Sequence, residues 1–391
     1  MEAAHETMLL MFPRCLLMLA LLLAGGGRGF SLSLLHWNVA GNGASDWSTN
    51  SLQVQAIGRQ MLYWRPEVVT FNEIPFDESA QMTNFVAAYL PGYFLAMNSG
   101  TDGYLRSAIA SRYPVARSQK HLDGVSLVPF GYTNSPSTFT RDLFEAEIIV
   151  PGWAQRLHVF TTHLKATESG ANFTNSVRRR AAEASAISNF FVTVFLPTYG
   201  ARPYVLTGDL NEDIARPPTS GGQPFSGLPI QRLTSAPTGL RLTTPLNPVT
   251  ASSNSFSIRG TLNTRLDYIL PGGLLFSNVA GSQVFRTDRL SPMPPNLFTN
   301  DSETASDHLP VIMSFHNPYD PAPRLLSVAT SNQFVNLRWS SSTGRAYRVE
   351  VSTNFATWSV SSTNLLATAT NQFWSAPRSG PRQFFRVRQM P

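Results

Sequence analysis

The chain has 391 residues, a formal net charge of +6 and a hydrophobic content of 42%. This length and apolar content exclude a disordered or fibrous protein and predict a large domain accompanied by a smaller one. The single cysteine, Cys15, lies in an apolar segment near the N-terminus, so the rest of the chain has no thiol. A disulfide framework, a thiol nucleophile and a thiolate metal site are therefore excluded.

Residues 1–29 are predicted to form a secretory signal peptide. Met8 to Ala24 are almost wholly apolar, and a run of small residues follows up to Gly29. A retained membrane anchor is the alternative, but the uninterrupted run from Cys15 to Ala24 is too short to span a bilayer, and no second apolar segment follows. We therefore expect a secreted protein, extracellular or periplasmic, with no transmembrane span after processing.

Residues 30–316 are predicted to form the main domain, because apolar strands alternate here with longer segments of mixed character. Two segments have the apolar faces typical of helices, one from Leu52 to Leu62 and one from Ala181 to Phe195. The pattern favours an α/β sandwich with helices outside two packed sheets. Three strands are apolar nearly throughout, as expected when both sheet faces are covered: Val68–Phe71, Leu157–Thr161 and Tyr204–Thr207.

Six short polar signatures stand at the ends of predicted strands or beside them. Their carboxylates, amides and imidazoles suit metal-assisted cleavage of a phosphoester. Any one signature has an ordinary structural explanation, such as a strand end, a turn or a capped loop, but chance explains all six in this order poorly. The six are His36-Trp37-Asn38, Phe71-Asn72-Glu73, Thr162-His163-Leu164, Gly208-Asp209-Leu210-Asn211, Leu266-Asp267-Tyr268 and Ser306-Asp307-His308.

The chemistry of five residues follows from their positions. Glu73 ends a buried strand, where a carboxylate is costly unless it is paired or binds a metal. Asn38 precedes a glycine-containing turn, so its amide can meet a cation or orient a carboxylate. Asp209 and Asn211 are two residues apart and can face the same side, where Asp209 can orient an attacking water and Asn211 can bind the phosphate. His163 can donate a proton or hydrogen bond to a phosphoryl oxygen.

The signatures resemble those of the endonuclease/exonuclease/phosphatase superfamily. The resemblance extends from about Phe30 to Phe315, and its most specific parts are Gly-Asp-Leu-Asn and Ser-Asp-His. It implies a four-layer α/β/β/α sandwich and divalent-metal phosphoesterase chemistry. Glu73 would then be the principal Mg²⁺ ligand, with Asn38 and Asp307 beside it, and Mn²⁺ or Ca²⁺ would be the alternative ions.

The same resemblance implies the catalytic roles. Asp209 would position or deprotonate the attacking water, and Asn211 would donate to the phosphate. His308, oriented by Asp267, would act either as general base or as a stabiliser of the pentavalent transition state. His163 would support the phosphoryl oxygen or the leaving group.

Several basic or irregular segments have two interpretations each. Arg106 precedes a strand and is predicted to contact substrate phosphate, with a strand-flanking ion pair as the alternative. Arg178 to Arg180 are expected to open a helix and to form a solvated face, with a contact to nucleic acid as the alternative. Ala215 to Ser226 form either a loop at the rim of the active site or a disordered insertion. The stretch Tyr104–Ile109 lacks the Glu of the deoxyribonuclease branch, which argues against a simple deoxyribonuclease copy.

Residues 317–324 are predicted to be a linker, since three prolines occur within six residues. Residues 325–391, the C-terminal module, contain alternating strands and are predicted to form a small all-β sandwich resembling fibronectin type III-like modules of secreted bacterial enzymes. Trp339, Tyr347 and Trp358 are expected in its core. From Pro321 onward there are eight arginines and one glutamate, whereas residues 30–320 carry a net charge of −1. The module is therefore expected to bind polyanions or a surface.

Three functional classes remain. The preferred hypothesis is a secreted Mg²⁺-dependent nuclease or phosphodiesterase, with nucleic acid favoured over phospholipid as substrate. A sphingomyelinase-like phospholipase C requires the same site and an exposed apolar rim. A non-catalytic surface-binding protein on this fold would tolerate the loss of catalytic groups, and their presence argues against that hypothesis.

Overall fold

The computed structural model describes residues 32–390, except residues 43, 45, 100, 101, 221, 226, 321, 322, 332 and 380–382. The described residues form two compact units, one ending at Asp320 and the other beginning at Pro323. The predicted signal peptide lies outside the described residues. Within them, no helix has the length and apolar character needed to cross a membrane.

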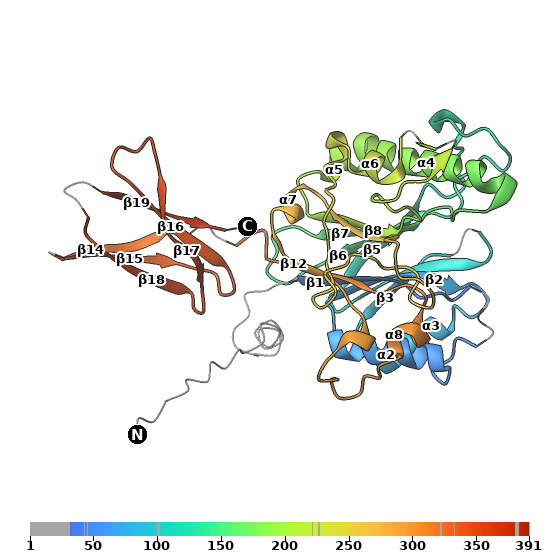
Figure 1. Ribbon diagram of the computed structural model, residues 1–391, viewed down its shortest axis with the longest axis horizontal. Coiled ribbons are helices and arrows are strands. Elements are labelled where there is room, and N and C mark those ends of the chain that lie inside the picture. The colour runs from blue at the N-terminus through green and yellow to red at the C-terminus, as the bar shows by residue number, and fades with distance from the viewer. Residues whose placement is uncertain are drawn as a thin grey trace, which may run out of the picture. The chain divides into compact units, whose positions relative to one another are not determined.

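The larger unit contains two large β-sheets (Figure 1) and a small two-stranded sheet of β9 (Thr219–Ser220) and β10 (Gln223–Pro224). The first sheet has six strands in the order β12-β13-β1-β2-β4-β3, and the second has five in the order β11-β8-β7-β6-β5. In the first sheet the strands are β1 (Leu32–Asn38), β2 (Val68–Pro75), β3 (Phe94–Met97), β4 (Leu105–Ser111), β12 (Val279–Val284) and β13 (Val311–Phe315). In the second they are β5 (Val115–His121), β6 (Leu143–Ile148), β7 (Leu157–His163), β8 (Tyr204–Asp209) and β11 (Asp267–Pro271).

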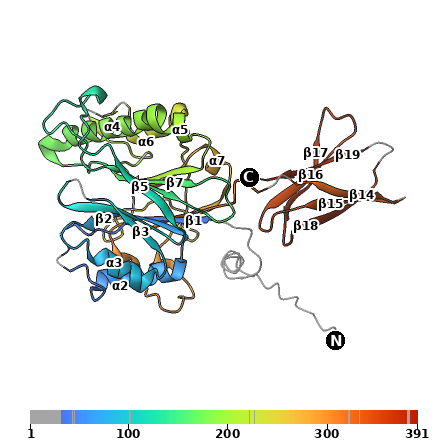
Figure 2. The ribbon, with the colours of Figure 1, turned by 180° about the vertical axis from the view of Figure 1, so that it is seen from behind.

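Helices cover the outer face of each sheet (Figures 1 and 2). The first sheet is covered by α2 (Leu52–Trp64), α3 (Gln81–Tyr89) and α8 (Asp301–Ala305). The second is covered by α4 (Phe173–Phe190), α5 (Leu196–Tyr199) and α6 (Pro229–Leu233). The predicted four-layer α/β/β/α sandwich is thus confirmed. The remaining short elements are α7 (Gly273–Phe276), η1 (Val128–Phe130), η2 (Gly170–Asn172), η3 (Phe191–Phe195), η4 (Ala236–Thr238) and η5 (Thr287–Arg289).

Apolar side chains on both faces of the central strands hold the four layers together. In β1 and β2, Trp37 and Phe71 pack toward α2 and α3, whereas Leu34 and Val68 belong to the layer between the two sheets. Burial on both faces explains why these strands are apolar nearly throughout. Each buried aromatic or aliphatic side chain of this kind contributes roughly 1.5–3 kcal/mol to folding.

Helix α4 differs from the sequence prediction at its start. It begins at Phe173, not at Arg178, and continues into the π-helical turn η3. The expectation of a solvated face at Arg178–Arg180 is wrong for Arg180, which is buried and donates from Nη1 to the Lys165 carbonyl at 2.9 Å. Arg180 points inward because another segment of the chain supplies this carbonyl acceptor. The local charge pattern of the sequence does not predict such a contact.

The C-terminal module consists of two antiparallel sheets, as predicted for an all-β unit. One has the order β14-β15-β18 and the other β17-β16-β19. Trp339 and Tyr347 are buried in the core as expected, but Trp358 lies outside it, half-buried beneath the guanidinium of Arg386. The strands are β14 (Leu325–Thr330), β15 (Phe334–Ser340), β16 (Ala346–Ser352), β17 (Ser359–Leu366), β18 (Asn371–Pro377) and β19 (Phe384–Gln389).

A buried amide links the two sheets of the larger unit. Asn72 of β2 accepts a hydrogen bond from the Asp209 backbone N–H at 3.0 Å, across the interface. Its Nδ2 donates to Ser107 Oγ at 3.0 Å and to Thr161 Oγ1 at 3.3 Å. One side chain therefore fixes the positions of β2, β4, β7 and β8 relative to one another.

Replacing this amide should destabilise the larger unit. Asn72→Ala leaves the buried Asp209 N–H without its acceptor, and we expect a loss of about 1–3 kcal/mol in the free energy of unfolding. Urea unfolding measures it, with Asn84→Ala on the exposed face of α3 as a matched control. A loss for Asn72→Ala no greater than that for Asn84→Ala would show that the cross-sheet bonds do not stabilise the fold.

Candidate active site

Most of the predicted site residues meet at one edge of the two sheets. β1 and β2 are parallel neighbours, as are β7 and β8, so their carboxyl ends lie at the same edge of each sheet. Asn38 ends β1 and Asp209 ends β8, and Asp209 is paired with both His163 of β7 and Asp267 of β11. Sheet packing thereby brings together residues that are far apart in the sequence.

Asn38 lies between two carboxylates that come from different sheets. Its Nδ2 donates to Glu73 Oε1 at 3.0 Å and to Asp209 Oδ2 at 2.9 Å. Its Oδ1 accepts the backbone N–H of Ala40 at 3.0 Å, which fixes the orientation of the amide. Asn38 therefore orients both carboxylates through its nitrogen, and its role as a metal ligand stays a prediction.

Glu73 has an unusual backbone conformation. Its φ is +60°, and the pairing of β2 with β4 is irregular between Phe71 and Ile74. The Glu73 carbonyl accepts the backbone N–H of Gly41 at 2.9 Å, and a Cβ on Gly41 would lie only 2.2 Å from that oxygen. Left-handed backbone at a non-glycine residue persists only when its surroundings enforce it. Gly41 is the residue that permits this arrangement.

Glu73, His163 and Asp209 form a group that fits a divalent cation. Each offers a ligand atom, and these atoms all lie within 4.8 Å of one another. His163 Nε2 is 3.7 Å from Glu73 Oε1 and 3.5 Å from Asp209 Oδ2. Burial lowers the pKa of His163 well below its usual value, so the imidazole does not balance the carboxylates. Two converging carboxylates that share one amide donor favour a bound cation.

Asp209 is a buried carboxyl with a raised pKa. Burial raises its pKa to about 7, and the negative charges of Asp267 and Glu73 act in the same direction, against the attraction of His308. Asp307, the other predicted ligand, is half-buried and contacts Ser306 Oγ at 3.5 Å. It is not part of the Glu73–His163–Asp209 group, and its role as a ligand stays a prediction.

His308 is held in a fixed orientation by Asp267. Its Nδ1 lies 2.8 Å from Asp267 Oδ2, which also accepts from Ser255 Oγ at 2.7 Å. Its Nε2 faces Asp209 Oδ2 at 3.7 Å. Burial disfavours the charged imidazole, but Asp267 and Asp209 outweigh it and raise the pKa of His308. Burial likewise opposes ionisation of Asp267, and the charge of His308 overcomes it and lowers that pKa.

The two predicted substrate-binding residues, Asn211 and Arg106, have different surroundings. Asn211 donates from its backbone N–H to Asp209 Oδ1 at 2.9 Å and from Nδ2 to the Leu164 carbonyl at 3.0 Å. It therefore joins the end of β8 to the segment after β7. Arg106 stands opposite Ile74 in the pairing of β4 with β2. Its guanidinium carbon lies 4.5 Å from the centre of the Phe76 ring. Within the described residues Arg106 forms no ion pair, so the alternative of a strand-flanking ion pair is not observed.

Sequence reasoning assigned no role to several residues that build the site. Ser306 Oγ donates to the Asn38 carbonyl at 2.8 Å and accepts the His308 backbone N–H at 3.0 Å, and Asn72 supports Asp209. Both stand inside signatures and were open to prediction. Arg141 Nη1 donates to the His163 carbonyl at 3.1 Å. Neither Arg141 nor Ser255 stands in a recognisable motif, so no sequence signal was available for them.

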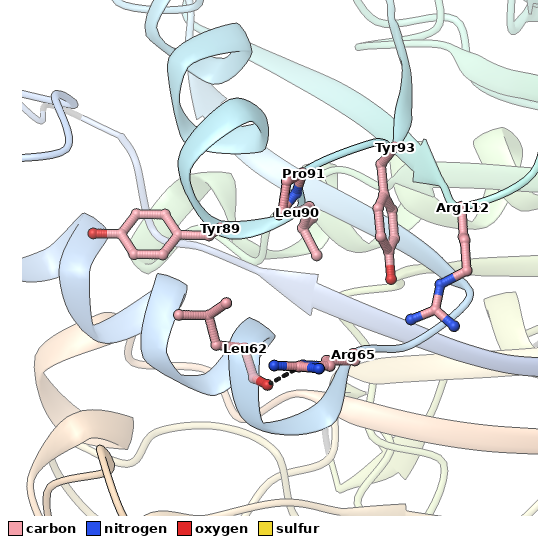
Figure 3. A pocket seen from close by; sticks show the side chains of 7 residues that line it. All are labelled: Leu62, Arg65, Tyr89, Leu90, Pro91, Tyr93 and Arg112. Atoms are coloured by element: carbon pink, nitrogen blue, oxygen red, sulfur yellow. Dashed lines mark hydrogen bonds between the residues drawn. The ribbon is translucent and has the colours of Figure 1, made fainter.

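A separate pocket of about 250 Å³ lies away from these residues. Arg65 precedes β2 and Arg112 follows β4, so the pocket is at the end of these strands opposite to Glu73. Figure 3 shows Arg112 beside Tyr93, with Arg65 across the pocket at the end of α2. The pocket therefore contributes no side chain to the candidate active site.

The fold and the site define a class of enzyme. A four-layer sandwich that brings Glu73, Asp209 and an Asp267-oriented His308 to one edge is the arrangement of a metal-dependent phosphoesterase. The model of the Endonuclease/Exonuclease/phosphatase family matches residues 35–308, and the chain belongs to this family. The sequence resemblance is thereby confirmed at the level of the family. A search of the curated proteins found no match.

Several solved structures are similar to this chain. Truncated TDP2 of Caenorhabditis elegans is 16% identical, with 74% of this chain and 99% of that chain covered and a TM-score of 0.48. Beta toxin 275-280 of Staphylococcus aureus is also 16% identical, with 72% and 99% covered and a TM-score of 0.49. The human Nocturnin catalytic domain with bound sulfate is 16% identical, with 74% and 94% covered and a TM-score of 0.48. The family assignment rests on the family model and not on these structures.

Gly41→Ala should weaken metal binding without touching a ligand. The added methyl group collides with the Glu73 carbonyl and displaces that residue, so we expect about a 10- to 100-fold loss of Mn²⁺ affinity, as for other supporting residues of metal sites. Isothermal titration calorimetry measures this. Gly273→Ala is the control, because a Cβ there meets no atom within 4 Å. Equal affinities in the two variants would contradict a role for Gly41 in holding Glu73.

Proposed function

We propose that this protein is a secreted, Mg²⁺-dependent nuclease or phosphodiesterase that hydrolyses phosphodiester bonds of nucleic acid by metal-assisted attack of water. One observation carries the proposal. Glu73 from the first sheet, Asp209 and Asp267 from the second sheet, and His308 from the segment before β13 converge at one point. A non-catalytic protein would not need the full set of catalytic groups in this mutual geometry.

The carboxylates of Glu73 and Asp209 support cation binding at the site. Glu73 would hold the cation, with Asp209 and His163 nearby and with Asn38 and Asp307 as the further predicted ligands. Bound there, Mg²⁺, or alternatively Mn²⁺ or Ca²⁺, would neutralise charge on the phosphate and favour ionisation of water. The oxygen-rich donor set suits these hard cations better than a softer metal.

Asp209 and His308 would share the work on water and phosphate. The Nδ1 of His308 is occupied by Asp267, so Nε2 is the nitrogen available to the substrate. It faces Asp209, whose Oδ1 is fixed by the backbone N–H of Asn211. Asp209 would orient the attacking water, while Nε2 of His308 would donate to a phosphoryl oxygen as negative charge develops there.

His163 and the supporting residues complete the mechanism. His163 Nε2 faces the carboxylates of Glu73 and Asp209, and from that position it would support a phosphoryl oxygen or the leaving group. Arg141 holds the backbone carbonyl of His163, which positions the imidazole without contact to the substrate. Asn211 would donate its remaining amide hydrogen to the phosphate, and Arg106 would contact a phosphate further from the scissile bond.

The proposal includes secretion of the protein and a fibronectin type III-like fold for the C-terminal module. The apolar segment and small residues within 1–29 support export of the mature chain. Two three-stranded antiparallel sheets around Trp339 and Tyr347 support a fibronectin type III-like module. The surplus of arginine after Pro321 supports nucleic acid as the polymer that the enzyme attacks.

Removing either catalytic group should abolish most of the turnover. We expect His308→Ala and Asp209→Asn each to lower kcat/KM by about 10²- to 10⁴-fold, since each removes one positioned proton-transfer or orienting group. Hydrolysis of bis(p-nitrophenyl) phosphate in Mg²⁺ measures this, with exposed Asp77→Asn as the control. Turnover near that of the wild type in a folded His308→Ala variant would exclude the proposed role.

The substrate class is tested by a panel with and without a chelator. We expect cleavage of single-stranded RNA or of duplex DNA that stops in EDTA and returns with Mg²⁺, because the charge of the two carboxylates requires a cation before an anionic substrate can bind. Sphingomyelin cleavage in vesicles without cleavage of nucleic acid would identify a phospholipase C instead. Hydrolysis that continues unchanged in EDTA would contradict metal dependence.

A further inference from the structure

The sheet β17-β16-β19 of the C-terminal module has a basic outer face. Tyr347 and Val349 of β16 point into the core, so Arg348 and Glu350 alternate to the other side. Paired residues of neighbouring strands share a face, and Arg348 is paired with Arg388 while Glu350 is paired with Arg386. Three arginines therefore surround one glutamate on this side of the sheet.

The charges on this face are not balanced within the module. Glu350 binds both Arg348, at 2.8 Å, and Arg386, and it is the only acidic side chain after Pro321. Arg388 is exposed and forms no hydrogen bond or ion pair within the described residues. Arg348 and Arg388 stand directly opposite each other, and like charges in that position are destabilising. An anion bound between them would remove this repulsion.

Aromatic rings adjoin the arginines. The guanidinium carbon of Arg386 lies 4.2 Å from the centre of the Trp358 ring, and Nε of the same group is held by Glu350. Trp358 Nε1 donates to the Phe355 carbonyl at 3.1 Å, and Phe355 is 62% exposed. Phe355 lies against Phe384, the first residue of β19. The cation and the rings are ordered before any ligand binds, which reduces the entropy lost on binding.

We propose that this basic-aromatic face, formed by Arg348, Arg386, Arg388, Trp358, Phe355 and Phe384, binds single-stranded nucleic acid. Bases stack on the aromatic rings and on the Arg386 plane, while Arg348 and Arg388 bind the phosphates between them. A duplex hides the faces of its bases and would use the arginines alone. That this bound strand is also the substrate rests on the proposed function, whereas the binding itself does not.

Binding to the full-length protein in EDTA separates this proposal from catalysis. Fluorescence anisotropy with a fluorescein-labelled oligo(dT) or oligo(rU) gives the affinity over a range of salt concentrations. We expect Arg388→Glu to weaken binding by about tenfold or more and to lower the slope of log K against log salt by about 0.7 for each lost phosphate contact. Arg338→Glu makes the same change of charge on the other sheet of the module, and binding should stay within about twofold.

Loss of an aromatic ring gives the second comparison. Trp358→Ala and Phe355→Ala should each weaken binding by on the order of tenfold, because each removes a stacking platform. Phe373→Ala is the matched control, since Phe373 is equally exposed but stands on the sheet that contains β15 and β18. Phe355→Ala should disturb folding less than Trp358→Ala because Phe355 is exposed and Trp358 is half-buried, and circular dichroism checks the structure of each variant.

The outcomes are distinguishable. Equal losses for Arg388→Glu and Arg338→Glu would show attraction by net charge alone and would overturn the proposal. The proposal would also be overturned if the protein bound phosphatidylserine vesicles but not the oligonucleotide, and if Arg388→Glu abolished the vesicle binding. Absence of oligonucleotide binding with bis(p-nitrophenyl) phosphate hydrolysis intact would refute this face and leave the proposed function standing. Oligonucleotide binding without any hydrolysis in Mg²⁺ would refute the proposed function and leave the binding role of this face standing.

Discussion

The site depends on one constraint, which is that two carboxylates from different sheets are held close together on a single amide. Glu73 and Asp209 both accept hydrogen bonds from Asn38 Nδ2, and burial raises the pKa of Asp209. Nothing local in the sequence would bring these like charges together. The apolar layer between the sheets does so, because residues such as Leu34 and Val159 can be buried only when the sheets pack face to face. A divalent cation would relieve the resulting repulsion.

Glycine and small polar residues allow the strands to approach closely enough. A Cβ on Gly208 would lie 2.2 Å from the Thr162 carbonyl on the neighbouring strand, and Gly41 leaves room for the left-handed backbone at Glu73. Asn72 supplies the hydrogen bond acceptor that the Asp209 backbone needs at the buried interface. The geometry of the candidate site is therefore determined more by the surrounding scaffold than by the candidate catalytic side chains themselves.

The sequence predicted the layers, and it singled out most of the residues that the structure brings together at the candidate site, for identifiable reasons. Strands such as Val68–Phe71 are apolar on both faces only when both are covered, and the signatures stand where parallel strands end. Contacts between segments that are separated in the sequence could not be predicted. Arg180 turns inward because it donates to the Lys165 carbonyl, and Trp358 lies outside the core, against the guanidinium of Arg386. Periodicity reports which side of an element is buried, but not which partner a polar side chain finds across the fold.

The most direct measurement is a crystal structure of the protein grown with Mn²⁺, with an anomalous difference map calculated at the manganese edge. We expect one strong peak per chain within roughly 2.0–2.6 Å of a Glu73 carboxylate oxygen, the range of hard-cation coordination. The same map for Glu73→Gln should have no peak there. A peak bound elsewhere on the wild-type chain, with none beside Glu73, would contradict the claim that the convergence of the two sheets creates the metal site.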